Sequence, residues 1–205
     1  PPGDERILLV HGFADVHWTP WWDRLEYYLE RSGYSPRRVH RMNLGNIPWT
    51  TIKDPREYGT KICRKMNELY EIEEQPVDII AHSMGGLGAR WCIQELGGGQ
   101  QIDDLITLGT PHQGVEGTVV SSNWAQYLVG YVPAGAKALQ PGSDLLTTLN
   151  RGPLPKSVDF TAVWSKTDYV FFLSEWRQRR NGFYPEHLAK QPNVTNLRLP
   201  FYEGH

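Results

Sequence analysis

The sequence of 205 residues lacks the features that mark several large classes of protein. No stretch approaches the roughly 18 consecutive apolar residues that a transmembrane helix needs. An excess of one charge is also missing, because 21 Lys and Arg are set against 23 Asp and Glu. Such a balance gives no electrostatic footprint for nucleic acid. We therefore expect a domain without a transmembrane segment, whose partner is a small molecule rather than nucleic acid.

Cysteine is scarce, since only Cys63 and Cys92 occur. Both fall in stretches that we expect to be helices covering a sheet, where buried free thiols are the default and a disulfide is the alternative. Clusters with the spacing of metal ligands are missing too. Asp15 and His17 lie close together in the sequence but belong to no recognisable ligand set. The sequence implies neither a metal nor a cofactor.

The most informative segment, residues 77–86, reads Val-Asp-Ile-Ile-Ala-His-Ser-Met-Gly-Gly. A short apolar run with β-branched residues ends in small residues around Ser83, and apolar residues at helical spacing follow. A strand, a sharp turn with serine at its apex and then a helix make the nucleophile elbow of an α/β-hydrolase. The turn needs small residues two positions before and after the serine, and Ala81 and Gly85 meet that need. Ser83 is the predicted nucleophile.

Two backbone amides are candidates for the oxyanion hole of such an enzyme. One amide comes from the residue after the nucleophile and the other from the loop after an early strand. Met84 and Phe13 occupy these positions, and Phe13 follows the apolar run 6–10 in the sequence His-Gly-Phe. Gly12 lets this loop turn an amide inward. The helix beginning at Met84 adds the partial positive charge of its N-terminus.

A serine hydroxyl needs a base to take its proton, and that base needs a third group to orient it. In α/β-hydrolases the three groups follow in the order serine, acid, histidine. Asp168 follows the predicted strand 160–165, and His205 follows the predicted strand 194–199. The carboxyl ends of parallel strands are where such a sheet places its site. Asp168 and His205 are therefore the predicted acid and base.

The other acids and histidines are less well placed. Asp159 begins a predicted strand and should lie at the wrong edge of the sheet, and Asp144 should open a short helix over buried leucines. His112 precedes the plausible acids and is interpreted as a loop histidine near the rim of the pocket. His187 lies in a polar stretch and is interpreted as solvated.

Three stretches, Leu-Val-His-Gly-Phe, Ala-His-Ser-Met-Gly-Gly and Leu-Gly-Thr-Pro-His-Gln-Gly, resemble the small bacterial lipases. The resemblance is to the Bacillus-type group, in which alanine opens the serine motif, and it covers residues 5–205. It implies the triad Ser83, Asp168 and His205, with oxyanion amides from Phe13 and Met84. It also implies activity on acylglycerols or other carboxylic esters without a cofactor. Secretion is implied by the resemblance alone, and a cytoplasmic location is the alternative.

Strands and helices alternate along the chain without internal repeats, which predicts a single domain over residues 1–205. We expect the minimal α/β-hydrolase fold, α/β in class, with a mostly parallel sheet of about six strands and helices on both faces. The predicted strands are 6–10, 38–44, 77–82, 102–109, 160–165 and 194–199, and the strand at 38–44 is the least apolar and hence an edge. Asp-Pro-Arg-Glu at 54–57 predicts a capping box that opens a helix to about residue 74.

Residues 114–139 are expected to set substrate preference, because long loops after strand ends commonly carry function. Trp124 and Leu128 fall at helical spacing. One interpretation is a lid, a helix over the nucleophile that exposes these apolar side chains at a lipid surface. The alternative is a fixed helix whose apolar side chains belong to the core. Trp18, Trp21 and Trp22 are predicted to line the acyl side of the pocket, with core packing as the alternative for Trp21 or Trp22. His82 is predicted to contact substrate beside the nucleophile.

The sequence therefore predicts a carboxylic-ester hydrolase, a lipase or esterase that acts through an acyl-enzyme on lipid or other apolar acyl esters. Transient contact with a lipid interface is part of this prediction. Thioesterases, phospholipases and acyltransferases use the same triad, because the fold does not choose the leaving group. A non-catalytic lipid-binding homologue is the alternative outside enzymes.

Overall fold

A six-stranded parallel sheet forms the centre of the computed structural model, which describes residues 5–12, 15–45, 53–115, 134–165 and 186–199. Its strands lie in the order β2-β1-β3-β4-β5-β6, and every neighbouring pair is parallel. The strands are β1 (Arg6–Val10), β2 (Val39–Arg41), β3 (Val77–His82), β4 (Ile102–Leu108), β5 (Asp159–Ser165) and β6 (Val194–Leu199). This confirms the predicted fold class, with β2 as an edge strand.

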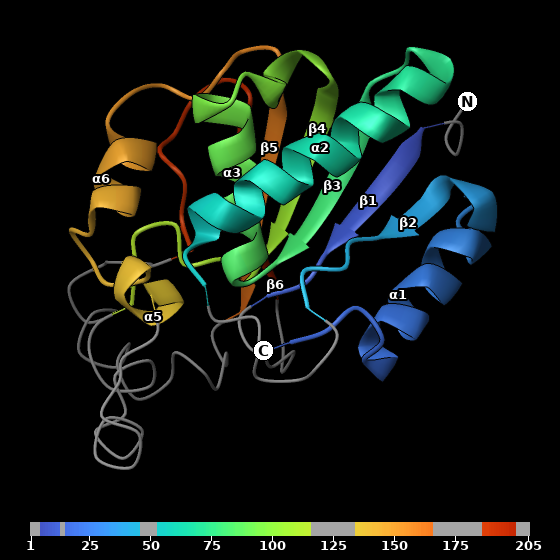
Figure 1. The fold of residues 1–205 in the computed structure, drawn as a ribbon, viewed down its shortest axis with the longest axis horizontal. Helices are drawn as coiled ribbons and strands as arrows, with labels where there is room; N and C mark the ends of the chain where they lie inside the picture. Colours follow the sequence, from blue (N-terminus) through green and yellow to red (C-terminus); the bar gives the residue numbers. More distant parts are fainter. Residues whose placement is uncertain (1–4, 13–14, 46–52, 116–133, 166–185, 200–205) are drawn as a thin grey trace.

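Helices occupy the successive connections from β1 to β5 (Figure 1). The α-helices are α1 (Pro20–Arg31), α2 (Pro55–Glu73), α3 (Met84–Glu95), α5 (Ala134–Ala138) and α6 (Asp144–Asn150), and short 3₁₀ turns lie at Pro36–Arg38 and Gly98–Gln100. Among the residues that the structure describes, no helix is long and apolar enough to cross a membrane.

Helices cover both faces of the sheet. Successive side chains of a strand point to opposite faces, so neighbouring residues pack against different helices. Leu8 and Ile79 pack in a large apolar cluster with side chains of α2 and α3. Their neighbours Ile7 and Ile80 pack on the other face with Trp22 and further apolar side chains of α1. The central strands are therefore apolar on both sides, as expected for a parallel sheet between two layers of helices.

Only one of the two hydrogen bonds of the predicted capping box forms at the start of α2. The carboxylate of Asp54 accepts a hydrogen bond of 2.9 Å from the backbone N–H of Arg56. The carboxylate of Glu57, expected to complete the capping box, instead binds the Lys53 ammonium at 3.0 Å. Pro55 occupies the first helical position, where its missing N–H costs nothing.

A disulfide between Cys63 and Cys92 joins α2 to α3, so the expectation of free thiols was wrong. The two helices cross closely because each has a glycine at the contact. A Cβ atom on Gly59 would lie 2.9 Å from the carbonyl oxygen of Gly88. Each cysteine follows its glycine by four residues, one helical turn, and so lies on the same face of its helix. At this crossing the two Cα atoms of the cysteines are 5.3 Å apart.

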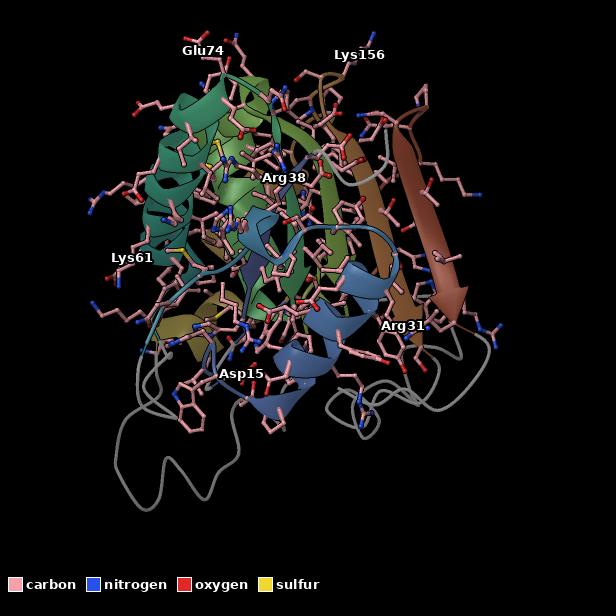
Figure 2. The ribbon with its side chains drawn as sticks, turned by 90° about the vertical axis from the view of Figure 1, so that its right-hand side faces the viewer. Asp15, Arg31, Arg38, Lys61, Glu74 and Lys156 are labelled. Carbon is pink, nitrogen blue, oxygen red and sulfur yellow. A yellow bond between two sulfur atoms is a disulfide. The ribbon has the colours of Figure 1, made fainter. Side chains whose placement is uncertain are left out.

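The parallel order brings the carboxyl ends of all strands to one edge of the sheet. In Figure 2, Glu74 and Lys156, which precede β3 and β5, lie at one end of the molecule, and Asp15, which follows β1, lies at the other. Ser83 directly follows β3 and belongs to that second end. This is the edge at which open α/β sheets bind their ligands.

Candidate active site

Ser83 links β3 directly to α3 and has the backbone conformation of a sharp turn. Its φ of 52° and ψ of −130° lie outside the regions that non-glycine residues prefer. A conformation of this kind costs on the order of 1–3 kcal/mol and persists only where surrounding contacts enforce it. The side chain is only 6% exposed. The predicted sequence of strand, sharp turn and helix around Ser83 is therefore present, and the role of Ser83 as nucleophile stays a prediction.

The turn is closed by small residues that the neighbouring loop approaches. A Cβ atom on Gly85 would lie 2.6 Å from the carbonyl oxygen of His11. A Cβ atom on Gly12 would lie 2.7 Å from the Cβ of Ser83 and 3.3 Å from its hydroxyl oxygen. Only glycine fits at these two positions, so the loop after β1 directly contacts Ser83.

His11 holds this loop in place. The side chain is fully buried, and its Nε2 accepts a hydrogen bond of 3.1 Å from the backbone N–H of Leu44. Because Nε2 is the acceptor, the ring proton of the neutral imidazole lies on Nδ1, 3.4 Å from the carbonyl oxygen of Gly12. Burial lowers the pKa of His11 and favours this neutral form. The imidazole therefore joins the loop after β1 to the loop after β2.

The oxyanion amides are described in part. Met84, 1% exposed, begins α3 immediately after Ser83, so its amide belongs to the positive end of the helix. Phe13 lies outside the described residues, and only its neighbour Gly12 is seen against Ser83. Its role as the second donor stays a prediction.

Asp168 and His205 also lie outside the described residues, as do Trp124 and Leu128. The strands expected to precede the acid and the base are present: β5 ends at Ser165 and β6 ends at Leu199. Both strands run parallel to β3, so they end at the edge that carries the serine. The triad assignment and the two substrate contacts stay predictions.

The side chains predicted to line the acyl pocket differ in their surroundings. Trp18 is 51% exposed. His82 is half-buried, and its ring packs edge-on against Trp21 with 5.0 Å between the ring centroids. Trp22 is 1% exposed and belongs to the core between α1 and the sheet. Trp22 is therefore a core residue, whereas the contacts of Trp18, Trp21 and His82 with substrate stay predictions.

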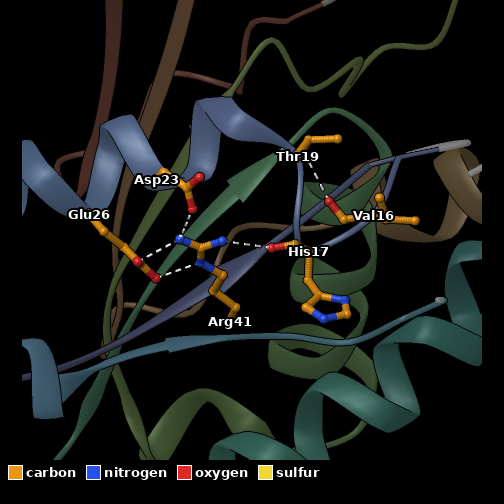
Figure 3. A network of polar contacts seen from close by, with 6 residues as sticks. All are labelled: Val16, His17, Thr19, Asp23, Glu26 and Arg41. Carbon is orange, nitrogen blue, oxygen red and sulfur yellow. Dashed lines mark hydrogen bonds and ion pairs between the residues drawn. The ribbon is translucent and has the colours of Figure 1, made fainter. Parts of the chain in front are cut away.

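The segment 15–19, which carries Trp18, is anchored from β2 (Figure 3). The Arg41 guanidinium donates a hydrogen bond of 3.1 Å to the carbonyl oxygen of His17. It also donates bonds of 2.6 Å to the carboxylates of Glu26 and Asp23 on α1. These acceptors, Glu26 foremost, raise the pKa of Arg41. One cation thereby fixes the backbone directly before Trp18 to both β2 and α1.

His112 differs from the sequence interpretation, since it lies fully buried rather than near a pocket rim. Its Nδ1 is 3.3 Å from a guanidinium nitrogen of Arg90, and its Nε2 is 3.0 Å from the hydroxyl of Thr107. His187, expected to be solvated, packs edge-on against Trp164 with 5.0 Å between ring centroids. Sequence reasoning missed Arg90 altogether, although an arginine on the apolar helix after a nucleophile elbow was a usable signal.

Outside the elbow, a pocket lies beside the helices that flank the sheet. This pocket of about 410 Å³ between the start of α2 and α5–α6 is lined by charged side chains, among them Arg56, Lys137 and Asp144, and does not include Ser83. Its lining mixes these charged side chains with Ala134, Ala138 and Leu145, unlike the mostly apolar lining that is typical of small-molecule pockets. Within the described part of the chain, no three histidines, cysteines or carboxylates lie close enough together to hold a metal ion.

A parallel sheet in this order, helices on both faces and a serine at the elbow after β3 define an α/β-hydrolase. Comparison with known families gives the more specific assignment. The sequence model of the palmitoyl protein thioesterase family matches residues 6–169. The chain belongs to this family.

Solved structures with the same fold include lipases, which confirms the resemblance stated from the sequence. The mature form of lipase BlEst2 from Bacillus licheniformis aligns with a TM-score of 0.73 at 20% identity, over 100% of this chain and 84% of the lipase. Aspergillus fumigatus lipase B aligns with a TM-score of 0.71 at 18% identity, over 95% of this chain but 44% of that protein. A monoacylglycerol lipase from Paleococcus ferrophilus gives a TM-score of 0.61 at 11% identity, over 96% and 86% of the two chains. At these identities the likeness concerns the fold.

Proposed function

We propose that the protein is a serine hydrolase that cleaves esters of apolar acyl chains. The observation that carries this proposal is the strained elbow at Ser83 with Gly12 packed against its side chain. In the proposed reaction, the Ser83 hydroxyl attacks the acyl carbonyl while His205 takes its proton and Asp168 orients the imidazole. The amides of Phe13 and Met84 stabilise the oxyanion.

The second half of the reaction returns the enzyme to its starting state. Collapse of the tetrahedral intermediate breaks the bond to the leaving group, which takes the proton from His205, and the acyl group stays on Ser83. Water then gives a proton to His205 and attacks the acyl-enzyme. The carboxylic acid leaves, and the proton returns to the Ser83 oxygen. No cofactor enters any step of this proposal.

Two substrate classes are supported by different observations. The lipase fold favours oxygen esters of lipids. The family match favours thioesters of long acyl chains, palmitoyl among them. The triad serves both, because the fold does not choose the leaving group. Phospholipase or acyltransferase activity, or lipid binding without catalysis, would use the same pocket.

The disulfide bears on the cellular compartment of the protein, and residues 114–139 bear on its substrate preference. The Cys63–Cys92 bond supports an oxidising compartment and hence secretion over a cytoplasmic location. The backbone N–H of Val115 donates a hydrogen bond of 2.8 Å to the carbonyl oxygen of Leu139, so this excursion of the chain begins and ends at one place. We propose that it sets substrate preference, with Trp124 and Leu128 in contact with substrate.

The first experiment is labelling of the folded protein with a fluorophosphonate probe, followed by peptide mass spectrometry. The probe requires an activated serine and an oxyanion hole, but no knowledge of the substrate. Labelling confined to Ser83, and lost in Ser83→Ala, supports the proposal. A folded wild-type chain that takes up no label refutes it. Rates on a palmitoyl oxygen ester and the matched palmitoyl thioester then separate lipase from thioesterase.

A further inference from the structure

The backbone of Ser83 is held on both sides by the end of β4 and the loop that follows it. Its N–H donates a hydrogen bond of 2.9 Å to the carbonyl oxygen of Leu108. Its carbonyl oxygen accepts a hydrogen bond of 2.8 Å from the hydroxyl of Thr110 and one of 3.1 Å from the N–H of Gly86. The unfavourable φ at Ser83 is therefore enforced from a neighbouring strand as well as by α3 itself.

The hydroxyl of Thr110 has little freedom to point elsewhere. Thr110 is 1% exposed. A Cβ atom on Gly86 would overlap the hydroxyl oxygen of Thr110 and lie 2.8 Å from its methyl carbon. The same atom would lie 3.0 Å from the methyl carbon of Thr107. The absent side chain of Gly86 makes the space in which Thr110 packs, and this packing aims its hydroxyl at Ser83.

His112 fixes the loop two residues after Thr110. The Arg90 guanidinium can only donate, so the Nδ1 of His112 is the acceptor of their contact and the ring proton lies on Nε2. Nε2 donates to Thr107, whose hydroxyl donates to the carbonyl oxygen of Thr161 at 3.4 Å. Burial, with a smaller contribution from Arg90, holds the pKa of His112 well below its ordinary value. His112 is therefore neutral in this arrangement.

Arg90 joins the same loop to two helices. Besides His112, its guanidinium donates to the side chain of Gln94 at 3.0 Å, the carbonyl oxygen of Leu149 at 2.6 Å and the side chain of Asn150 at 3.1 Å. Asn150 in turn donates a bond of 2.8 Å to the carbonyl oxygen of His112. Among the described residues none of its acceptors is a carboxylate, so this buried cation is satisfied by neutral groups that α3, α6 and the loop bring together.

We propose that Thr110 is a positioning residue for the nucleophile and that the Arg90–His112 pair holds Thr110 in place. The inference rests on the proposed serine-hydrolase function. Thr110 touches neither substrate nor the reacting hydroxyl and acts through the backbone carbonyl of Ser83. Loss of its hydroxyl therefore relaxes the elbow and slows attack, but it leaves the acyl pocket unchanged. The expected signature is a fall in kcat with an unchanged KM.

Two matched substitutions at one position test this. Thr110→Val keeps the shape and removes the hydroxyl, whereas Thr110→Ser keeps the hydroxyl and removes the methyl. We expect Thr110→Val to lower kcat, and the second-order rate of fluorophosphonate labelling at Ser83, by about 10-fold or more, since small misplacement of a reacting group is costly. KM should stay within about twofold. Thr110→Ser should label within about threefold of wild type. Both rates are measured per folded molecule, with the folded fraction taken from thermal melts.

The outcomes separate this inference from the proposed function. If wild type is labelled at Ser83 and Thr110→Val is labelled equally fast, the inference fails and the function stands. If both variants lose activity alike, packing rather than the hydroxyl is responsible, and the inference also fails. If the folded wild type is not labelled, the proposed function falls and the inference with it. Should Thr110→Val not fold, Thr107→Val against Thr107→Ser replaces the pair, and a selective kcat loss in the valine variant is again required.

Discussion

Removing the disulfide between α2 and α3 should lower the free energy of unfolding by an amount set by the length of the loop that the disulfide closes. The cysteines are 29 residues apart, so the bond closes a loop of about 30 residues. In the chain-entropy description, such a cross-link removes about 12 cal/mol/K from the unfolded state, or about 3.6 kcal/mol at 25 °C. For a protein of about 200 residues each kcal/mol corresponds to roughly 2–4 °C, so the melting temperature should fall by about 7–14 °C.

The assay compares oxidised wild type, wild type with reductant and the double variant Cys63→Ala, Cys92→Ala by calorimetry and urea unfolding. Both cysteines are buried at a helix crossing, so a small apolar side chain such as alanine is the suitable replacement. Reductant should lower the melting temperature of wild type toward that of the double variant and leave the double variant unchanged. Activity at 25 °C should be retained, because the close approach of Gly59 to Gly88 keeps the helices together without the bond.

Two results would refute this reasoning. Equal stability of the oxidised and reduced wild type would mean that no bond forms in solution or that it constrains nothing. A loss of activity in a double variant that is still folded would mean that the bond positions α3, and hence Ser83, rather than constraining the unfolded chain.

Three further predictions concern titration, catalysis and substrate form. Burial, followed by repulsion from Asp104, raises the pKa of Asp78 to about 7. A carboxyl whose pKa is raised on folding stabilises below its unfolded value and loses this contribution as the pH rises through about 7. Asp78→Asn should therefore gain about 1–2 kcal/mol at pH 8 and nothing at pH 4 in urea titrations, after discounting for partial exposure. An equal effect at both pH values would contradict the titration. Asp168→Asn should fold normally but lower kcat by orders of magnitude, and near-normal turnover would show that another residue is the acid. If residues 114–139 form a lid, the rate should jump when an ester substrate exceeds its solubility limit, whereas smooth saturation through that limit favours the fixed helix.

Features set by short stretches of sequence were predictable. The strands at β3, β5 and β6 lie within about one residue of the predicted bounds, because apolar runs and flanking turns mark them locally. The edge strand β2 is shorter than predicted at both ends, since a 3₁₀ turn occupies Pro36–Arg38 before it and the strand ends at Arg41 rather than at residue 44. The sharp turn at Ser83 was predictable because its motif, small residues included, is continuous in sequence.

Features that depend on how elements meet were not predictable. The pairing of Cys63 with Cys92 follows from a helix crossing that glycines in two separate segments create. The buried contact of His112 with Arg90 joins residues that are 22 positions apart in the sequence. Single-residue reasoning assigns each of these side chains its usual environment, whereas their actual environment is defined by residues far away in the chain.

The elbow at Ser83 combines both kinds of information. Ala81 and Gly85 allow the turn, because larger side chains would not fit beside it, but small residues also allow many other conformations. What selects the strained one is the end of β4, where Leu108 and Thr110 bind the two backbone groups of Ser83. In this fold the small-x-Ser-x-Gly motif thus permits the strained turn at Ser83 without by itself selecting it. Residues 81–85 placed after the corresponding strand of a related domain, whose neighbouring strand is not followed by a threonine equivalent to Thr110, should give a folded domain with a poorly reactive serine. The Thr110→Val and Thr110→Ser variants measure how much of the reactivity of Ser83 comes from Thr110.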